Sequence, residues 1–190
     1  MFKDQQGAVI TVFILLIIPL LLVGLFATNN FSKTVHDYDV SLQNGVSEAV
    51  RNAAFMVNRN TLALGKPTIN PKEAHNAFKK VLFSHTPEKQ VESYTFVVYN
   101  GYGDGGEVYI FRKGSTDPVT STIGAGYSAV FTVTTNDVVI GNGANAVTMT
   151  EPGCIAVVGL KPDNFLKNDE DADPGYRWAA STIVLAKDFY

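Results

Sequence analysis

The sequence contains one cysteine and no run of lysine or arginine residues. Cys154 is the single cysteine among 190 residues, which excludes an intrachain disulfide and a cysteine-based zinc cage. Fifteen Lys and Arg residues stand against 18 Asp and Glu residues, giving a formal net charge of -3. Binding to nucleic acid needs a basic surface that displaces counterions from phosphates. The sequence therefore predicts no nucleic-acid partner.

Catalytic signatures are missing as well. The chain has no nucleophile elbow, no paired-histidine zinc motif, no phosphate-binding loop followed by a helix and no dinucleotide fingerprint. His36, His75 and His85 are scattered without a partner four residues away, so we expect surface histidines. Cys154 opens an apolar run and is expected to be a buried, inert thiol. We interpret the chain as a protein without enzymatic activity and without a cofactor.

One acidic segment has the oxygen ligands that calcium prefers. Its carboxylates fall within five residues, at Asp169, Glu170, Asp171 and Asp173. The spacing lacks the glycine and the distant glutamate of an EF-hand loop. A solvated acidic loop is the favoured interpretation, and these residues are only a weak candidate for a metal site.

The most prominent feature present is a long apolar block at residues 8–27, AVITVFILLIIPLLLVGLFA. A charge-free helix of about 20 residues is long enough to cross a bilayer core of about 30 Å. The expected span is marked along its length by Ala8, Phe13, Pro19, Gly24 and Ala27. The alternative is a cleaved secretory signal, but its apolar region would be shorter and would end in a small-x-small site.

The few charges before the block predict its orientation. Residues 1–7 carry Lys3 as their positive side chain, with Asp4 opposing it. The positive-inside rule then favours a cytoplasmic N-terminus. The prediction is a single-pass protein of the cell membrane, with residues 1–30 as leader and anchor and the bulk of the chain extracytoplasmic or at the cell surface.

The helical pattern continues beyond the apolar block, through an amphipathic stalk at residues 31–58. Apolar residues recur there at spacings of three and four. The seam consists of Val35, Tyr38, Leu42, Val46, Ala49, Ala53 and Met56. Two interpretations stay open: the seam packs against another helix, as in a heptad pattern, or it covers the face of the following domain. Either way, one continuous helix is expected from about residue 8 to residue 58.

Residues 59–190 are expected to form the extracytoplasmic domain. Asn70, Pro71 and Glu73 are the cap, the first-turn proline and the capping-box acid of a helix at 71–84. From Gln90 to the end, at residues 90–190, the period changes to two and turn residues separate strand-like runs. The predicted fold class is α+β: a long N-terminal transmembrane helix continues into an amphipathic helix, which packs on an antiparallel sheet or small sandwich.

The N-terminal third resembles the TadE/TadG-like proteins of tight-adherence (Flp) pilus systems. The resemblance rests on residues 7–13, on Pro19 to Leu22 within the apolar block, on Leu42-Gln43-Asn44 and on the alanine-rich residues 48–54. Membership would imply a pilus assembly protein, a minor pilin or a pseudopilin-like component of a pilus or related secretion apparatus. Its partners would be the membrane and other pilin-like or assembly subunits, contacted through the N-terminal helix.

The resemblance also implies a possible prepilin peptidase site between Gly7 and Ala8. Polymerising pilins usually carry a glutamate a few residues into the apolar segment, and residues 9–16 contain no carboxylate. An uncleaved assembly component is therefore favoured over a cleaved minor pilin. The remaining alternative is a membrane-tethered extracellular binding module unrelated to pili.

Overall fold

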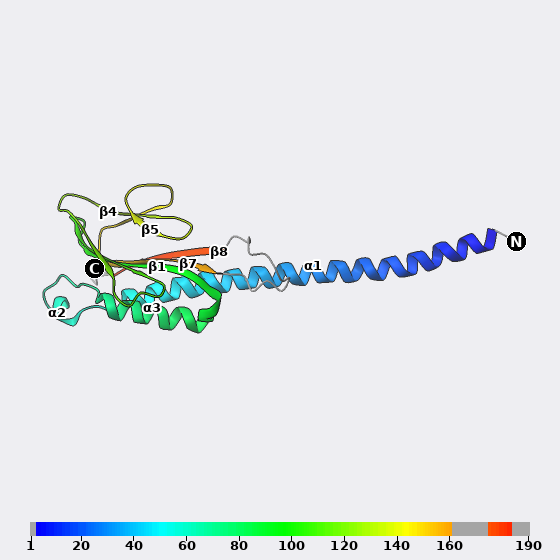
Figure 1. The fold of residues 1–190 in the computed structure, drawn as a ribbon, viewed down its shortest axis with the longest axis horizontal. Coiled ribbons are helices and arrows are strands. Elements are labelled where there is room, and N and C mark those ends of the chain that lie inside the picture. Colours follow the sequence, from blue (N-terminus) through cyan, green and yellow to red (C-terminus); the bar gives the residue numbers. More distant parts are fainter. Residues whose placement is uncertain (1–2, 161–174, 184–190) are drawn as a thin grey trace, which may run out of the picture. The chain divides into compact units, whose positions relative to one another are not determined.

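The computed structural model describes residues 3–160 and 175–183 (Figure 1). Its first element is a single helix, α1 (Lys3–Ala54), and the side chains described within it are those of residues 15–30, 33 and 40–54. The prediction of one continuous helix through apolar block and stalk agrees with this element. The chain divides into two compact units, Met1–Ser41 and Leu42–Tyr190, so the boundary falls inside the predicted stalk.

The predicted transmembrane anchor needs correction. In the part of the chain that the structure describes, no helix has the length and apolar character needed to cross a membrane. The predictions of a transmembrane helix and of a single-pass, membrane-anchored location are therefore not supported.

The second unit contains the rest of the secondary structure. Its helical elements after α1 are α2 (Arg59–Leu62), α3 (Pro71–His85) and the 3-10 helix η1 (Glu88–Gln90). Its strands are β1 (Val91–Gly101), β2 (Gly106–Arg112), β3 (Val119–Ile123), β4 (Ala129–Val133), β5 (Val138–Ile140), β6 (Ala146–Met149), β7 (Gly153–Leu160) and β8 (Gly175–Thr182). They form a five-stranded sheet of order β3-β2-β1-β7-β8 and a three-stranded sheet of order β5-β4-β6, with antiparallel pairing throughout. The antiparallel α+β part of the predicted fold class matches this arrangement.

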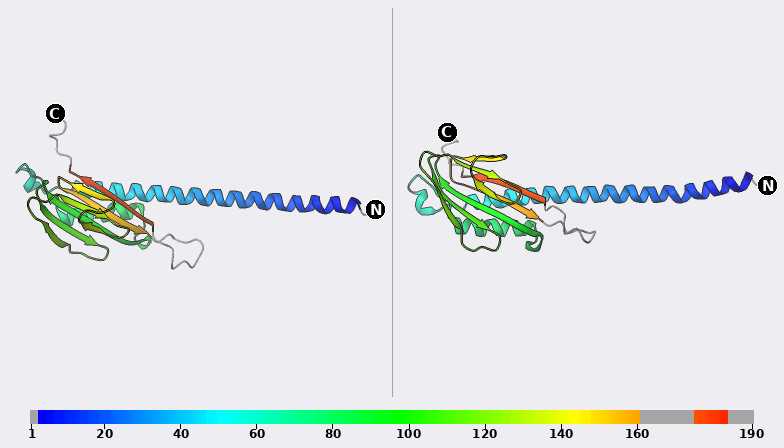
Figure 2. Two further views of the ribbon diagram at one scale, coloured as in Figure 1. Left: turned by 90° about the horizontal axis from the view of Figure 1, so that it is seen from above. Right: turned by 45° about the horizontal axis from the view of Figure 1, so that its top comes forward.

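The larger sheet lies between two layers. Figure 2 shows the last part of α1 and α3 on one face and the β4–β6 sheet on the other. Successive residues of β1 point to opposite faces, so Phe96 and Val98 join the core beneath the helices, whereas Val97 and Tyr99 join the core between the sheets. Strand β7 is buried along its whole length, which explains its uninterrupted apolar sequence.

Helix α3 begins with the capping residue and the first-turn proline that the sequence predicts. The Asn70 side chain accepts a hydrogen bond from the backbone N–H of Glu73, and Pro71 occupies the first turn. The helix ends at His85, one residue beyond the predicted end. Its buried face consists of Ala74, His75, Phe78 and Leu82, so α3 packs against the sheet as expected from its apolar pattern.

Helices α1 and α3 approach each other closely at Gly45. A Cβ atom at this position would lie 2.9 Å from Cβ of His85 and 3.1 Å from its Cγ. One turn further along α1, Glu48 Oε2 lies 3.0 Å from His85 Nε2. The glycine therefore provides the space in which the C-terminal end of α3 packs on α1, and the Glu48–His85 pair joins the two helices at the same place.

A large side chain at Gly45 is expected to destabilise the second unit. Gly45→Leu should lower the free energy of unfolding by about 1–3 kcal/mol, because a branched side chain would force α3 away from α1. Chemical denaturation followed by circular dichroism measures this change. Gly24→Leu is the matched control, since no atom lies within 4 Å of its added Cβ. Equal stability of the two variants would contradict the close helix contact.

Candidate assembly surfaces

The described part of the apolar block exposes its large side chains. Ten of them on α1 have 37% or more of their surface accessible: Leu15, Leu16, Ile17, Ile18, Leu20, Leu21, Leu22, Val23, Leu25 and Phe26. Consecutive residues of a helix point about 100° apart, so this apolar surface surrounds the helix instead of forming a stripe. Helices that are apolar on all sides are normally buried in a larger assembly of apolar groups. We call residues 15–26 the apolar segment.

The residues marked for the predicted span fall into two groups. Pro19, Gly24 and Ala27 lie in or beside the apolar segment, and Thr28 Oγ1 donates a hydrogen bond to the Gly24 carbonyl at 3.0 Å. Ala8 and Phe13 lie on α1, but their side chains are outside the described set. The same holds for Gly7 and Ala8 as a processing site.

The stalk seam is occupied within the second unit. Leu42, Val46, Ala49 and Ala53 are at most 5% exposed and belong to the core formed with α3 and the large sheet. Met56 is half-buried against that core, whereas the side chains of Val35 and Tyr38 lie outside the described set. The four buried residues cover the sheet. This arrangement agrees with the interpretation in which the seam covers the face of the following domain. They are not available to a helix of another molecule.

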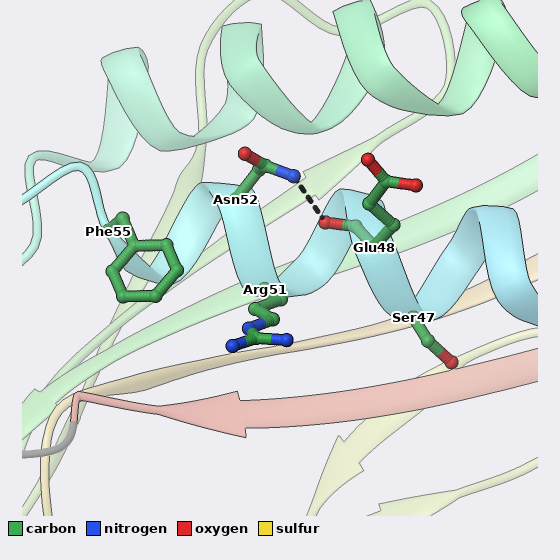
Figure 3. Close-up of a pocket in the computed structure, with 5 residues that line it drawn as sticks. All are labelled: Ser47, Glu48, Arg51, Asn52 and Phe55. Carbon is green, nitrogen blue, oxygen red and sulfur yellow. Dashed lines mark hydrogen bonds between the residues drawn. The ribbon is translucent and has the colours of Figure 1, made fainter.

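The outer face of the same part of α1 forms a shallow groove of about 500 Å³. Figure 3 shows Glu48 and Asn52 on the side of the helix that faces α3, with Asn52 Nδ2 donating to the Glu48 carbonyl at 3.0 Å. Ser47 and Arg51 point to the opposite side, and Phe55 is 64% exposed beyond the end of the helix. The groove combines the Phe55 ring with polar side chains, of which Glu48 is already paired with His85.

The connector between α1 and α3 is held rigidly. Asn100 of β1 accepts a hydrogen bond from Ile69 N at 2.8 Å and donates one to Ile69 O at 2.9 Å, so its amide pairs with the connector as a strand would. The Tyr102 hydroxyl donates to Pro67 O at 2.5 Å. Within the connector, Thr68 N donates to Thr61 Oγ1 at 2.9 Å. These bonds fix residues 58–69, which we call the leucine loop.

The leucine loop presents apolar side chains to solvent. Leu62 is 58% exposed and Leu64 is 80% exposed, and the exposed cations Arg59 and Lys66 flank them. Neither leucine contributes to a core of the described residues. Scattered exposed leucines are ordinary, but two at the tip of a loop fixed by several hydrogen bonds form a preorganised apolar surface.

A charged groove of about 690 Å³ lies where β1 begins and β2 ends. Glu88 and Glu92 are exposed at its rim, and no hydrogen bond or ion pair is observed for their carboxylates among the described residues. Its two cations are engaged: Arg112 bonds Asp137 Oδ2 at 2.9 Å and Lys113 Nζ donates to Val91 O. We call this the acidic groove, because the three carboxylates in its lining, Glu88, Glu92 and Asp137, outnumber its two cations.

Catalytic and metal-binding groups do not gather at these surfaces. Among the described residues, no group of three His, Cys, Asp or Glu side chains is placed to hold a metal ion. The calcium candidates Asp169, Glu170, Asp171 and Asp173 lie outside the described residues. Cys154 is buried as predicted, and burial raises the pKa of its thiol, which keeps the thiol protonated.

The histidines correct one expectation. His85 is half-exposed and pairs with Glu48, whereas His75 is only 2% exposed and lies in the core. Its position on the apolar face of α3, one residue after Ala74, is the signal in the sequence that indicates burial. The side chain of His36 is outside the described set.

The chain matches no known protein family model, no curated protein sequence and no solved structure. Interpretation of its function therefore rests on the surfaces described above. Two of them, the leucine loop and the acidic groove, were not predicted from the sequence. The available signal for the loop was Leu62 and Leu64 in a connector otherwise composed of polar residues, Gly65 and Pro67.

Proposed function

We propose that the chain is a pilin-like assembly subunit of a Tad/Flp-type pilus or a related secretion apparatus, with a structural role. Its N-terminal helix packs with the corresponding helices of neighbouring subunits. The observation that carries the proposal is the apolar segment of α1, with ten exposed large apolar side chains. The similarity of the N-terminal third to TadE/TadG-like proteins supports the same role.

The energetics favour burial of this segment. Complete removal of one leucine, isoleucine or phenylalanine side chain from water contributes about 1.5–3 kcal/mol. Ten such side chains, even if each is only partly buried between neighbouring helices, supply on the order of 10 kcal/mol toward association. Because the segment is apolar on all sides, a bundle that surrounds it satisfies more of this surface than a single partner contact.

The two halves of α1 make different contacts. From Leu42 onward its apolar face is buried against the sheet and α3, so this half holds the folded unit together. Residues 15–26 perform no such role among the described contacts. One helix thus contains a segment that stabilises the subunit and a segment whose apolar surface is left for other subunits.

A charge placed in the apolar segment is expected to prevent association. The full chain should sediment as an oligomer in aqueous buffer, and Leu20→Glu should shift it to the monomer, because a carboxylate surrounded by apolar helices is costly unless it is paired. Sedimentation velocity measures the distribution of species. Asn29→Glu, which adds the same charge to an exposed position of the same helix, should leave the oligomer intact.

Three results would contradict the proposal. The first is a wild-type chain that remains monomeric at concentrations up to the millimolar range. The second is a Leu20→Glu variant that associates as the wild type does. The third is uptake of wild-type monomers by phosphatidylcholine vesicles without self-association, since the segment would then prefer lipid to other subunits.

A further inference from the structure

The backbone at the tip of the leucine loop is hydrogen-bonded within the loop. Leu62 N donates to Asn58 O at 3.2 Å. Leu64 N donates to Thr61 O at 3.1 Å, and Gly65 N closes the following turn on Leu62 O at 3.2 Å. A backbone amide that leaves water for an apolar layer is costly unless it keeps such a partner. These three amides already have one, so the tip can enter an apolar layer without leaving them unpaired.

The charges at the tip are both positive. Residues 59–66 contain Arg59 and Lys66 and no carboxylate. Both cations are exposed, and no ion pair joins either of them to another described residue. A carboxylate lies beside the base of the loop, where Glu107 lines a groove together with Asn58 and Thr68. The tip is therefore cationic, although the whole chain has a formal net charge of -3.

Exposed leucines flanked by cations fit a layer that is apolar inside and anionic at its surface. A bilayer with anionic headgroups has this structure, with acyl chains below the phosphates. The leucine side chains can enter the acyl boundary, while the long arginine and lysine side chains keep their charged ends at the headgroups. Because hydrogen bonds from Asn100 and Tyr102 already hold the loop, little conformational entropy is lost on binding.

We propose that the leucine loop binds the surface of an anionic lipid bilayer. Leu62 and Leu64 insert at the boundary between headgroups and acyl chains, and Arg59 and Lys66 contact the lipid phosphates. The contact is peripheral, since a loop enters the outer part of one leaflet and no segment crosses the bilayer. It goes beyond the proposed assembly function and does not depend on it, because it uses the second unit and not the apolar segment of α1.

Co-sedimentation of the full chain with lipid vesicles tests the contact. Leu20→Glu serves as the parent protein, because its carboxylate opposes insertion of the apolar segment of α1 into the same vesicles. Vesicles of phosphatidylglycerol and phosphatidylcholine in equal parts are compared with vesicles of phosphatidylcholine alone. The parent should bind the anionic vesicles about tenfold more tightly or better, because each cation near an anionic surface contributes about fivefold in affinity.

Replacement of the two leucines measures the apolar part of the contact. Leu62→Ser combined with Leu64→Ser should weaken binding to the anionic vesicles about tenfold or more, because the inserted apolar side chains are lost. Val119→Ser is the matched control, since Val119 is 59% exposed on β3, outside the loop. This control should bind the vesicles as the parent does.

Replacement of the two cations measures the electrostatic part. Arg59→Gln combined with Lys66→Gln should weaken binding to the anionic vesicles about tenfold or more and remove the preference for them over phosphatidylcholine. Lys80→Gln combined with Lys89→Gln is the matched control, because both are exposed cations outside the loop. It removes the same charge from the chain and should change the affinity by less than about twofold.

Equal binding of the parent to both kinds of vesicle overturns the lipid contact. So does either loop variant that keeps the circular dichroism spectrum of the parent and binds the anionic vesicles equally well. The two loop variants change different exposed side chains, so a loss of fold in one leaves the other to decide. Failure of the proposed function is read separately, by sedimentation of wild type and Leu20→Glu without vesicles, where the loop is unchanged.

Discussion

Gly101→Ala is expected to be among the most destabilising single substitutions in the second unit, although it adds one methyl group. A Cβ atom at Gly101 would lie 2.2 Å from the Gly105 carbonyl oxygen and 2.2 Å from the Tyr99 hydroxyl. Tyr99 is fully buried, and its hydroxyl donates a hydrogen bond to that same carbonyl at 2.8 Å. Neither neighbour can move without disturbing the core between the sheets.

Two costs add in this variant. Overpacking of a tight site costs about 1–3 kcal/mol, and separating the Tyr99 hydroxyl from Gly105 leaves buried polar groups unsatisfied for about another 1–3 kcal/mol. A loss of about 2–6 kcal/mol in the free energy of unfolding is expected in urea denaturation. Gly175→Ala, with no atom within 4 Å of the added Cβ, should change it by less than about 1 kcal/mol. Similar midpoints for both variants would contradict the contact.

The same hairpin illustrates what the sequence can and cannot predict. The glycines at residues 101–106 are typical of a turn, and the turn between β1 and β2 lies there. The position of its tip depends on distant residues, since the buried Tyr99 hydroxyl donates to Gly105 O and Asp104 Oδ1 accepts a hydrogen bond from Gly126 N. Residue 126 follows the hairpin by some twenty positions, and a local pattern does not report contacts over that separation.

Elements with strong local signals were predicted well. The cap and proline of α3 are short-range features, and the period of two from Gln90 identifies strands. The pairing order was not predictable, because β7 lies between β1 and β8 while β4, β5 and β6 form a separate sheet. Strand order depends on long-range packing of both sheet faces, whereas the alternation along one strand predicts only which of its residues share a face.

The surface features differ in how far the sequence indicates them. The apolar block is evident from composition, although the structure does not support its interpretation as a membrane span. The acidic groove combines Glu88 and Glu92 with Arg112 and Asp137, which are brought together only by the pairing of β1 with β2 and by the β4–β5 hairpin. The position of Asn100 opposite Ile69 likewise depends on tertiary structure.

His75 occupies an aromatic environment beneath α3. Its ring stacks on Phe111 with centroids 4.2 Å apart, and its Nε2 lies 3.0 Å from the Tyr94 hydroxyl. Burial, with a smaller contribution from the charge of Lys79, lowers the pKa of His75 from 6.5 to about 4. The neutral imidazole is therefore the form that the fold accommodates.

The sign of the pH effect follows from this shift. Between pH 6.5 and about 4 the unfolded chain binds a proton at His75 that the folded chain does not. The contribution of the neutral ring to stability is thus complete above pH 6.5 and is lost as the pH falls through that range. A pKa shift of this size corresponds to a change of about 3 kcal/mol in the free energy of unfolding.

On the alkaline side, burial with the charge of Glu88 raises the pKa of Tyr94 from 10.0 to about 12. Ionisation of its hydroxyl therefore opposes folding as the pH rises from 10 toward 12.

Acidification is accordingly expected to destabilise the wild type through His75, and removal of the histidine should abolish that part of the loss. Urea denaturation at pH 7 and at pH 4 gives the two free energies of unfolding. His75→Leu combined with Tyr94→Phe replaces the hydrogen-bonded pair by apolar groups of similar size, which avoids leaving the Tyr94 hydroxyl unpaired. Between the two pH values, the double variant should lose about 3 kcal/mol less of its free energy of unfolding than the wild type.

His85→Gln, which alters the other histidine described on α3, should retain the His75 contribution. A double variant with the acid sensitivity of the wild type would show that protonation of His75 does not limit stability, and the carboxylates of the second unit would then account for the loss.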